Sequence, residues 1–243
     1  MHLSKSYWDG EILLVNVINQ TAGIFGGDRI MTHVIVQPGA RVLLSSPSAA
    51  RFHPSQGSES RLEQTFEIRA GGFLDVFPEI SIPQRDSRSF QKTSIRLEPG
   101  AELLYLETLA PGRVASGESF AFTDYRWWTD IYIADRLVLR ERASLSPRDS
   151  SLAGLSSLFP ASYYAGMVLV SPASESWNAD FAHAFTALEK DAAAKIAASK
   201  LSAGGWSIRL LAADGLTLRQ IIIKLRQMIY EHLGKPLPDP RRT

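Results

Sequence analysis

The sequence predicts a mainly β protein with a β-helical or stacked-strand body and two C-terminal α-helices, and so an α+β fold overall. Its first two-thirds consist of short runs in which β-branched, aromatic and aliphatic residues alternate or cluster, as they do in strands. Three turns between these runs resemble one another and recur at a nearly constant interval. The last third instead spaces its apolar residues as one face of a helix does.

We expect a single domain over residues 1–243. It divides into a β-rich body at 1–172, a helix–strand–helix segment at 173–235 and a polar tail at 236–243. The expected strands of the body lie at 11–19, 29–37, 41–46, 62–69, 73–77, 94–98, 102–107, 127–134 and 136–142.

The three similar turns read VIVQPGARVLL, FEIRAGGFLDVF and IRLEPGAELLYLE. Their first glycines, Gly39, Gly71 and Gly100, fall 32 and 29 residues apart. Two of the turns place proline second and glycine third, the type II pattern, which suits a corner where a strand bends and continues better than a tight hairpin. The interval and the corners together favour coils that stack on one another. A meander of ordinary hairpins is the alternative.

The last third predicts two helices with a strand between them. The first helix is expected over residues 178–200, with Asn178 as its N-cap. Its apolar face consists of Phe181, Phe185, Leu188, Ala192 and Ile196. A Gly204-Gly205 break then leads into a strand at 206–212.

The second helix is expected to begin at Thr217, whose hydroxyl forms a capping-box pair with Gln220. It ends at Gly234, and Pro236 lies just beyond. Helices that follow a β body are typical of α+β folds in which the helices gather on one side or at one end.

The composition is that of an ordinary globular protein, with 45% hydrophobic and 21% charged residues. The 26 basic and 25 acidic residues nearly cancel, which argues against a nucleic-acid partner. No apolar run approaches the roughly 18 residues that a bilayer-spanning helix needs, so we expect no membrane partner. The first residues lack a signal-peptide pattern, and a cytoplasmic location is therefore expected.

Two compositional facts argue against a permanently bound metal. The chain has no cysteine, which excludes thiolate ligands and thiol catalysis. Its five histidines form none of the short spacings that bind metals on helices or strands. We expect no permanent cofactor.

The glycine-rich segment TAGIFGGD at 21–28 does not match a nucleotide-binding loop. Its glycines, Gly23, Gly26 and Gly27, predict a close backbone approach or positive φ angles. Asp28 ends the segment, and its carboxylate is expected to accept N–H groups of the turn. A role for Asp28 as a weak metal ligand is the alternative.

Two further motifs carry paired charges. In PGRVASGESF, Gly112 and Gly117 flank a bend across which Arg113 and Glu118 can pair. In LRER, Glu141 stands between two arginines, a pattern that favours a salt-bridge ladder along a strand.

Several carboxylates lie at or beside segments that should stack in a solenoid, namely Glu11, Asp28, Glu107, Glu118 and Glu141. Side chains at matching edges of successive coils can line one internal channel. Scattered oxygen ligands suit weak, transient passage of a divalent cation, whereas tight capture needs converging imidazoles or thiolates. The sequence therefore suggests a channel for a passing cation.

Six segments in order carry a resemblance to a known family. They are GIFGGDRI with VQPGARVLLSSPSAARF, FPEISIPQRDSRSFQ, LYLETLAPGRVASGESFAF, LVLRERASL and, loosely, LPDPRRT. Together they resemble the urease accessory protein D/H family over most of the chain.

The resemblance implies a non-enzymatic scaffold with a helically wound β body. It implies that the chain binds apo-urease and an F-type accessory protein, and through the latter a G-type GTPase. It also implies that Ni²⁺ passes transiently along an internal channel, with Glu11, Asp28, Glu107 and Glu141 as the matching channel residues.

The chain departs from the family pattern in places. Family members carry additional N-terminal strands that precede a start such as HLSKSYWDG. The family's double glycine is Ala22-Gly23 here, and His53 adds a ligand that could bind metal weakly with Asp28. The C-terminal tryptophan of the family is missing.

Two other functions are also compatible with the sequence. A β-solenoid carbohydrate-active enzyme would need two carboxylates facing an open sugar groove. A structural interaction module would carry no metal traffic at all.

Overall fold

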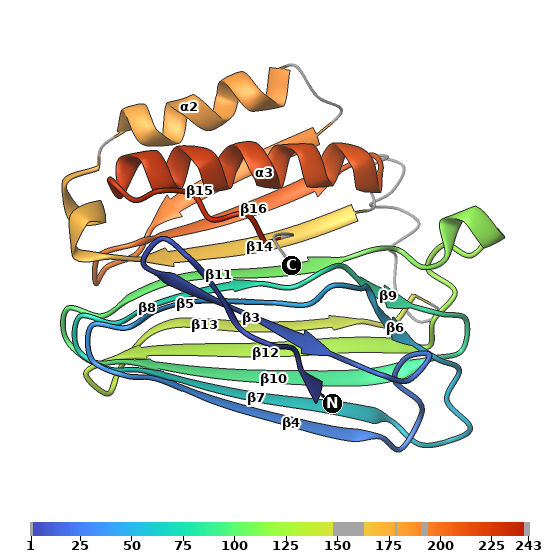
Figure 1. Cartoon of the computed structure of the whole chain (residues 1–243). Coiled ribbons are helices and arrows are strands. Elements are labelled where there is room, and N and C mark those ends of the chain that lie inside the picture. Colours follow the sequence, from blue (N-terminus) through green and yellow to red (C-terminus); the bar gives the residue numbers. More distant parts are fainter. Residues whose placement is uncertain (1, 148–162, 178, 191–193, 241–243) are drawn as a thin grey trace.

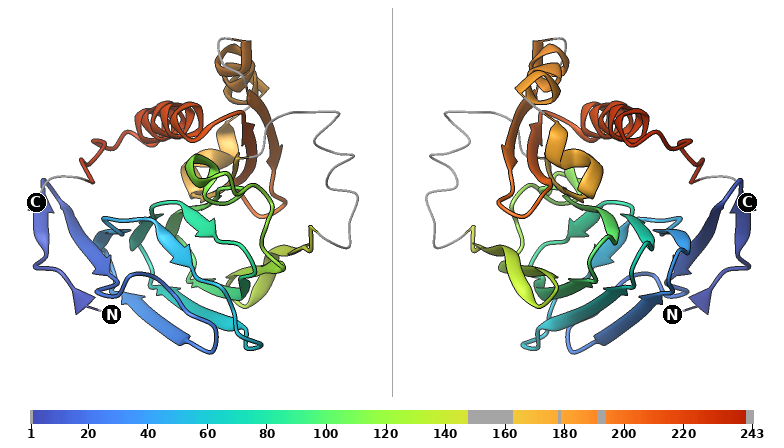
Figure 2. Two further views of the ribbon diagram at one scale, coloured as in Figure 1. Left: turned by 90° about the vertical axis from the view of Figure 1, so that its right-hand side faces the viewer. Right: turned by 90° about the vertical axis from the view of Figure 1, so that its left-hand side faces the viewer.

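The computed structural model describes residues 2–147, 163–177, 179–190 and 194–240. Two sheets pack face to face, and helices α2 (Ala179–Lys190) and α3 (Gly215–His232) cover the outer face of one of them (Figures 1 and 2). Over the residues that the structure describes, the mainly β architecture with two α-helices confirms the predicted fold class. No helix in the described part of the chain is long and apolar enough to cross a membrane.

Within the described ranges, the larger sheet has eleven strands, and its main path runs β1-β3-β5-β8-β11-β14-β16-β15. These eight strands are β1 (His2–Leu3), β3 (Ile12–Ile18), β5 (Arg41–Ser45), β8 (Phe73–Phe77), β11 (Glu102–Leu109), β14 (Tyr163–Val170), β16 (Trp206–Ala212) and β15 (Ala194–Lys200). Three short strands attach beside this path, namely β2 (Tyr7–Asp9), β6 (Ala50–Phe52) and β9 (Ser81–Pro83).

The smaller sheet, as far as the chain is described, has five strands in the order β13-β12-β10-β7-β4. They are β13 (Arg136–Leu145), β12 (Asp124–Ile133), β10 (Arg88–Leu97), β7 (Ser60–Ile68) and β4 (Arg29–Val36). The chain bends from β4 into β5, from β7 into β8 and from β10 into β11, so each coil gives one strand to each sheet. Successive coils pair in parallel, as a solenoid requires. The alternative of a hairpin meander is therefore wrong for this region.

The predicted type II corners are confirmed. The Ala40 N–H donates to the Gln37 carbonyl at 3.0 Å, and the Ala101 N–H donates to the Glu98 carbonyl at 3.0 Å. Gly100 has a φ of 78°, which is in the left-handed region. The corners also bond to one another, because the Gly39 N–H donates to the Ala70 carbonyl of the next coil at 3.3 Å.

Replacing Gly100 tests the corner directly. A Cβ atom at this position would meet nothing within 4 Å, so the whole cost is conformational. We expect Gly100→Ala to lower the free energy of unfolding by about 1–2 kcal/mol in urea denaturation, since a left-handed alanine is strained. Asparagine tolerates this conformation, so Gly100→Asn should lower the free energy of unfolding clearly less than Gly100→Ala does. Equal losses for the two variants would contradict this account.

The core has two main layers. Between the sheets, apolar side chains such as Phe66, Ile95 and Leu103 are fully buried. Between the larger sheet and the helices, the apolar face of α3 packs on the outward side chains of the strands. That face comprises Leu218, Ile221, Ile222, Leu225 and Ile229.

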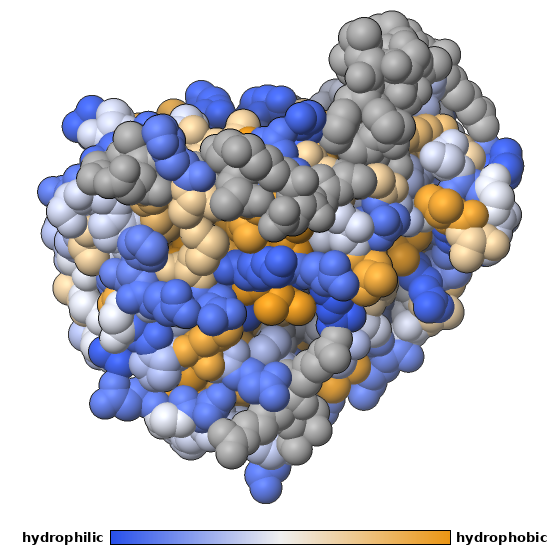
Figure 3. Space-filling view, turned by 90° about the horizontal axis from the view of Figure 1, so that it is seen from above, coloured by the Kyte–Doolittle hydropathy of each residue, from blue (hydrophilic) through white to orange (hydrophobic). Residues whose placement is uncertain are grey.

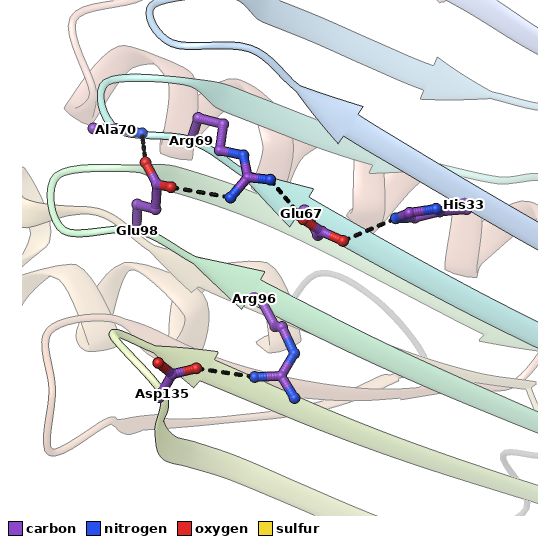
Figure 4. Close-up of polar contacts among 7 residues, drawn as sticks. All are labelled: His33, Glu67, Arg69, Ala70, Arg96, Glu98 and Asp135. Atoms are coloured by element: carbon purple, nitrogen blue, oxygen red, sulfur yellow. Dashed lines mark hydrogen bonds and ion pairs between the residues drawn. The ribbon is translucent and has the colours of Figure 1, made fainter.

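The surface on the helix side mixes apolar and hydrophilic side chains (Figure 3). Leu216 and Ile223 of α3 are 67% and 47% exposed there. On the outer face of the five-stranded sheet, Glu67 pairs with both His33 and Arg69, and Arg69 continues to Glu98 (Figure 4). These ion pairs cross three coils and so link them on the outside.

The predicted helix over 178–200 is wrong in its second half. The helix ends at Lys190, and Ala194–Lys200 forms strand β15, which pairs antiparallel with β16. In β15 the less exposed residues Ala194, Ile196 and Ala198 alternate with exposed ones, which is strand periodicity. The described part of segment 173–235 thus contains two strands rather than one. Asn178 and Ala192 lie outside the described residues.

The second helix is also capped differently from the prediction. It begins at Gly215, and its N-cap is Asp214, whose Oδ1 accepts the Thr217 N–H at 2.8 Å. Aspartate is at least as good an N-cap as threonine, so Asp214 takes the role expected of Thr217. The predicted end is confirmed, because Leu233 is the C-cap and Gly234 has a φ of 64°.

A buried polar cluster fastens α3 to the larger sheet. Asp75 of β8 is fully buried, and its Oδ2 accepts the Tyr230 hydroxyl at 2.6 Å and a guanidinium N–H of Arg226. The Arg226 guanidinium also lies 4.0 Å from the ring centroid of Phe77. The residues are more than 150 positions apart, so sequence periodicity gave no sign of this cluster.

Candidate functional site

A buried carboxylate lies between the two sheets. Glu107 of β11 is 9% exposed, and its Oε2 lies 3.3 Å from the Tyr105 hydroxyl. The Tyr105 hydroxyl is also 3.4 Å from Thr93 Oγ1, which donates to Gln64 Oε1 at 3.1 Å. Within the described residues, Glu107 Oε1 accepts no hydrogen bond although it is buried. Glu107 therefore retains one oxygen free to bind a ligand.

The environment of Glu107 favours its neutral form. Burial raises the pKa of Glu107 to about 8, and the nearby negative charge of Glu141 adds to the increase. The positive charge of Arg209 and the Tyr105 hydrogen bond act in the opposite direction. At neutral pH the Glu107 carboxyl is mostly protonated, so a cation that binds it must replace a proton.

Glu141 faces the same interior from the other sheet. Alternation along β13 points Glu141 inward, whereas Arg140 and Arg142 point outward and bind Asp130 at 2.9 and 2.7 Å. A salt-bridge ladder does form, but its carboxylate is Asp130 of β12. Glu141 is not the central member that the sequence pattern suggested.

The Glu141 carboxylate is held by three groups. Its Oε1 accepts the Tyr164 hydroxyl at 3.1 Å and the Trp127 indole N–H at 3.4 Å. Its Oε2 accepts from Arg209 Nη2 of β16 at 2.6 Å. Residues of both sheets therefore meet at this carboxylate.

A missing side chain makes room for this arrangement. Glu107, Gly166 and Arg209 lie directly opposite one another on β11, β14 and β16. A Cβ atom at Gly166 would stand 2.7 Å from the Tyr164 hydroxyl and 3.1 Å from Glu107 Oε1. Gly166 thus leaves the space in which the Glu107 carboxylate and the Tyr164 hydroxyl approach each other.

The site opens onto a cavity of about 150 Å³ between the sheets. Glu107, Trp127 and Tyr164 line it directly, and the exposed Ser48 lies at its rim. Further polar side chains line the wall, among them Asn19, Thr32, Ser45, Gln64, Gln91 and Thr108. The cavity can hold a small hydrated ion.

The structure brings together Glu107 and Glu141 of the four predicted channel residues. The other two lie at the surface. Glu11 pairs with Arg41 and its side chain is 80% exposed. Asp28 is exposed, and its Oδ2 accepts the Phe25 N–H at 2.8 Å, as expected of a turn acceptor.

Asp28 and His53, which are predicted to form a weak metal site, both lie beside Phe25. The His53 ring stacks on the Phe25 ring at a centroid distance of 4.4 Å. Among the described residues, no three His, Asp or Glu side chains are grouped so that they could hold a metal ion. Metal binding at this pair stays a prediction.

The close approach predicted for the glycine-rich segment is confirmed. A Cβ atom at Gly23 would stand 2.5 Å from the Arg51 carbonyl oxygen, and one at Gly26 would stand 2.7 Å from the Ser58 carbonyl oxygen. Gly27 has a φ of 90°. The segment is therefore a tight backbone crossing.

The predicted pairing across the second bend is also seen. Arg113 Nε donates to Glu118 Oε2 at 3.0 Å, and the Arg85 N–H donates to the same oxygen at 3.2 Å. The Arg113 hydrogen bond is the main cause that lowers the pKa of Glu118. Gly112 and Gly117 have φ angles of 144° and 73°, which lets the bend close.

Comparison with known proteins identifies the family. The family model of the UreD urease accessory protein matches residues 1–243. This chain belongs to that family. The urease accessory protein UreD of Opitutus terrae is 36% identical over 246 residues, which cover 99% of this chain and 89% of that protein. The UreD protein of Deinococcus radiodurans is 37% identical over 230 residues, which cover 93% of this chain and 79% of that protein.

The UreD assignment confirms the resemblance drawn from the ordered segments. The chain is a urease accessory protein, and its relatives are named as accessory proteins rather than as enzymes. The UreD protein of Acetivibrio thermocellus is 29% identical over 231 residues, which cover 94% of this chain and 87% of that protein.

Some site residues of this UreD family member were missed from the sequence. Arg209, Tyr105 and Tyr164 stand in strands among apolar residues, where no motif marks them. Gly166 within the apolar run YYAGMVLV was the available signal, because a glycine inside a strand often marks close approach of another group.

Proposed function

We propose that this urease accessory protein is a non-enzymatic, cytoplasmic scaffold for nickel insertion into apo-urease. In this role it binds apo-urease and an F-type accessory protein, and through the latter a G-type GTPase. Ni²⁺ is its passing cargo and not a resident cofactor. The observation that carries the proposal is the pair formed by the buried Glu107 and the partly buried Glu141 beside an internal cavity.

The chemistry of the pair suits passage better than storage. Oxygen ligands without imidazole or thiolate bind Ni²⁺ weakly. Glu107 keeps one oxygen free of hydrogen bonds from described residues, and the polar side chains among the cavity lining can hydrogen-bond the waters of a hydrated ion. A cation can therefore enter, exchange a proton at Glu107 and leave again.

The geometry favours this role over sugar hydrolysis. A glycoside hydrolase needs its two carboxylates on either side of a bound sugar in an open groove. Here Glu107 is buried between two sheets, and Glu141 is engaged by an arginine, a tyrosine and a tryptophan.

The test uses Glu107→Gln and Glu141→Gln in cells that express urease with all its accessory proteins. We expect each variant to lower the nickel content and activity of purified urease by roughly tenfold, the low end of what loss of a metal-orienting group costs. Co-purification with urease and the F-type protein should be unchanged. Glu98→Gln, on the outer face of the five-stranded sheet, is the matched control.

Normal nickel loading in both variants would contradict the nickel path and support a metal-free interaction module. Failure of the wild-type chain to co-purify with urease or the F-type protein would contradict the scaffold itself.

A further inference from the structure

We infer that Arg209 is a tethered internal counter-ion that prevents the Glu107–Glu141 pair from retaining a divalent cation. The inference rests on the proposed nickel path and assigns a regulator to it. In the absence of cargo, the Arg209 guanidinium binds the Glu141 carboxylate, so a passing ion has to displace the guanidinium.

The position of Arg209 is unusual for a surface arginine. It lies on the inner face of β16, in one row with Gly166 and Glu107. Its Nη2 donates to Glu141 Oε2 at 2.6 Å and its Nη1 to the carbonyl of Ile208 at 3.1 Å. Because Gly166 has no side chain, the space next to Arg209 is left to the Tyr164 hydroxyl and to Glu107 Oε1.

The charges explain why such a group is needed. Without Arg209, Glu141 would present an uncompensated negative charge beside the buried carboxyl of Glu107. In surroundings of low dielectric constant, that charge would attract a divalent cation strongly and slow its release. With Arg209 in place, the Glu141–Arg209 pair is neutral. A cation that binds Glu141 then gains only the difference between its own attraction to the carboxylate and the attraction of the guanidinium that it displaces.

The exposure of Arg209 allows the exchange. Its side chain is 31% exposed, whereas that of Glu141 is 18% exposed. The guanidinium can therefore turn towards water when a cation takes its place, while Glu141 stays anchored by Tyr164 and Trp127. A singly charged ion carries no more charge than the guanidinium and lacks its five donors, so the exchange favours divalent ions.

The experiment measures Ni²⁺ binding to the purified full chain by titration calorimetry and by quenching of tryptophan fluorescence. Trp127 bonds to Glu141 and so reports on the site. We expect Arg209→Gln to lower the Kd for Ni²⁺ at least about tenfold, because one full charge is removed from the pair. Arg209→Lys keeps the charge and should bind Ni²⁺ as wild type does.

The control is Arg142→Gln, which removes an equal charge from the outer face of β13. It should leave the Kd unchanged, and adding Glu141→Gln to Arg209→Gln should abolish the gain. Circular dichroism melting checks that each variant is folded. A Kd for Arg209→Gln within threefold of wild type, or an equal gain in Arg142→Gln, would overturn the inference.

The two proposals fail separately. Normal urease loading by Glu107→Gln and Glu141→Gln would refute the nickel path. Unchanged affinity of Arg209→Gln in the isolated chain would refute the counter-ion, whatever the result for urease.

Discussion

Replacing Asp75 by alanine is expected to lower the free energy of unfolding by about 3–5 kcal/mol. The reason is the buried Arg226, which is 3% exposed and would lose its carboxylate partner. Tyr230 would lose the acceptor of its hydroxyl as well. Because both residues belong to α3, the helix should loosen from the sheet.

The measurement is urea denaturation followed by circular dichroism, with the exposed pair of Arg219 and Glu79 as the control. Arg219 is on the same helix, and its ion pair with Glu79 spans 3.5 Å at the surface. Glu79→Ala should cost at most about 1 kcal/mol, as exposed pairs do. An equally small loss for Asp75→Ala would contradict the anchoring role.

A double variant distinguishes the loss of the Asp75–Arg226 attraction from the cost of leaving the charge of Arg226 unpaired in the interior. Asp75→Leu combined with Arg226→Met leaves no unpaired charge in the interior. It should therefore be more stable than Asp75→Ala alone, since buried ion pairs can often be replaced by apolar groups with little loss. A double variant less stable than Asp75→Ala would show that the pair itself stabilises the fold.

Replacing Glu107 by glutamine is expected to change how stability depends on pH. The folded pKa of about 8 lies above the ordinary value of 4.5, so between these pH values the unfolded chain releases a proton that the folded chain keeps. Folding of the wild type therefore becomes less favourable as the pH rises, by at most about 1.4 kcal/mol per pH unit. Glutamine does not titrate, and the variant lacks this loss.

Urea denaturation of both proteins at pH 5, 6, 7 and 8 tests this expectation. The variant should gain stability relative to the wild type steadily over that range. Glu98→Gln is the control, because hydrogen bonds from Ala70 and Arg69 lower the pKa of Glu98 and no such gain is expected. Parallel curves for wild type and Glu107→Gln would show that Glu107 is already ionised in the folded protein.

Local signals predicted much of the body. Proline and glycine at fixed turn positions marked the corners, and the interval between Gly39, Gly71 and Gly100 marked the stacked coils. Both are properties of a few neighbouring residues, so they can be recognised without knowing the partners of a strand.

The errors arose where long-range pairing decided the structure. Ala194–Lys200 is rich in alanine and reads as helix, but pairing with β16 makes it a strand. The sequence also does not show which side chains face solvent, so the predicted channel set combines the exposed Glu11 and Asp28 with Glu107 and Glu141, which face the interior. Arg209 stayed hidden since it lies 68 residues from Glu141.

The alternation along β13 has a consequence for the polarity of the interior. Glu141 points in, while Arg140 and Arg142 point out to Asp130. A slip of the strand by one position would exchange the two faces and replace one anion by two cations between the sheets. The pairing of β12 with β13 is irregular beside Ile131 and Tyr132, close to the turn that joins the two strands. This irregularity sets the register of β13 and so helps to decide whether the cavity between the sheets attracts or repels positive ions.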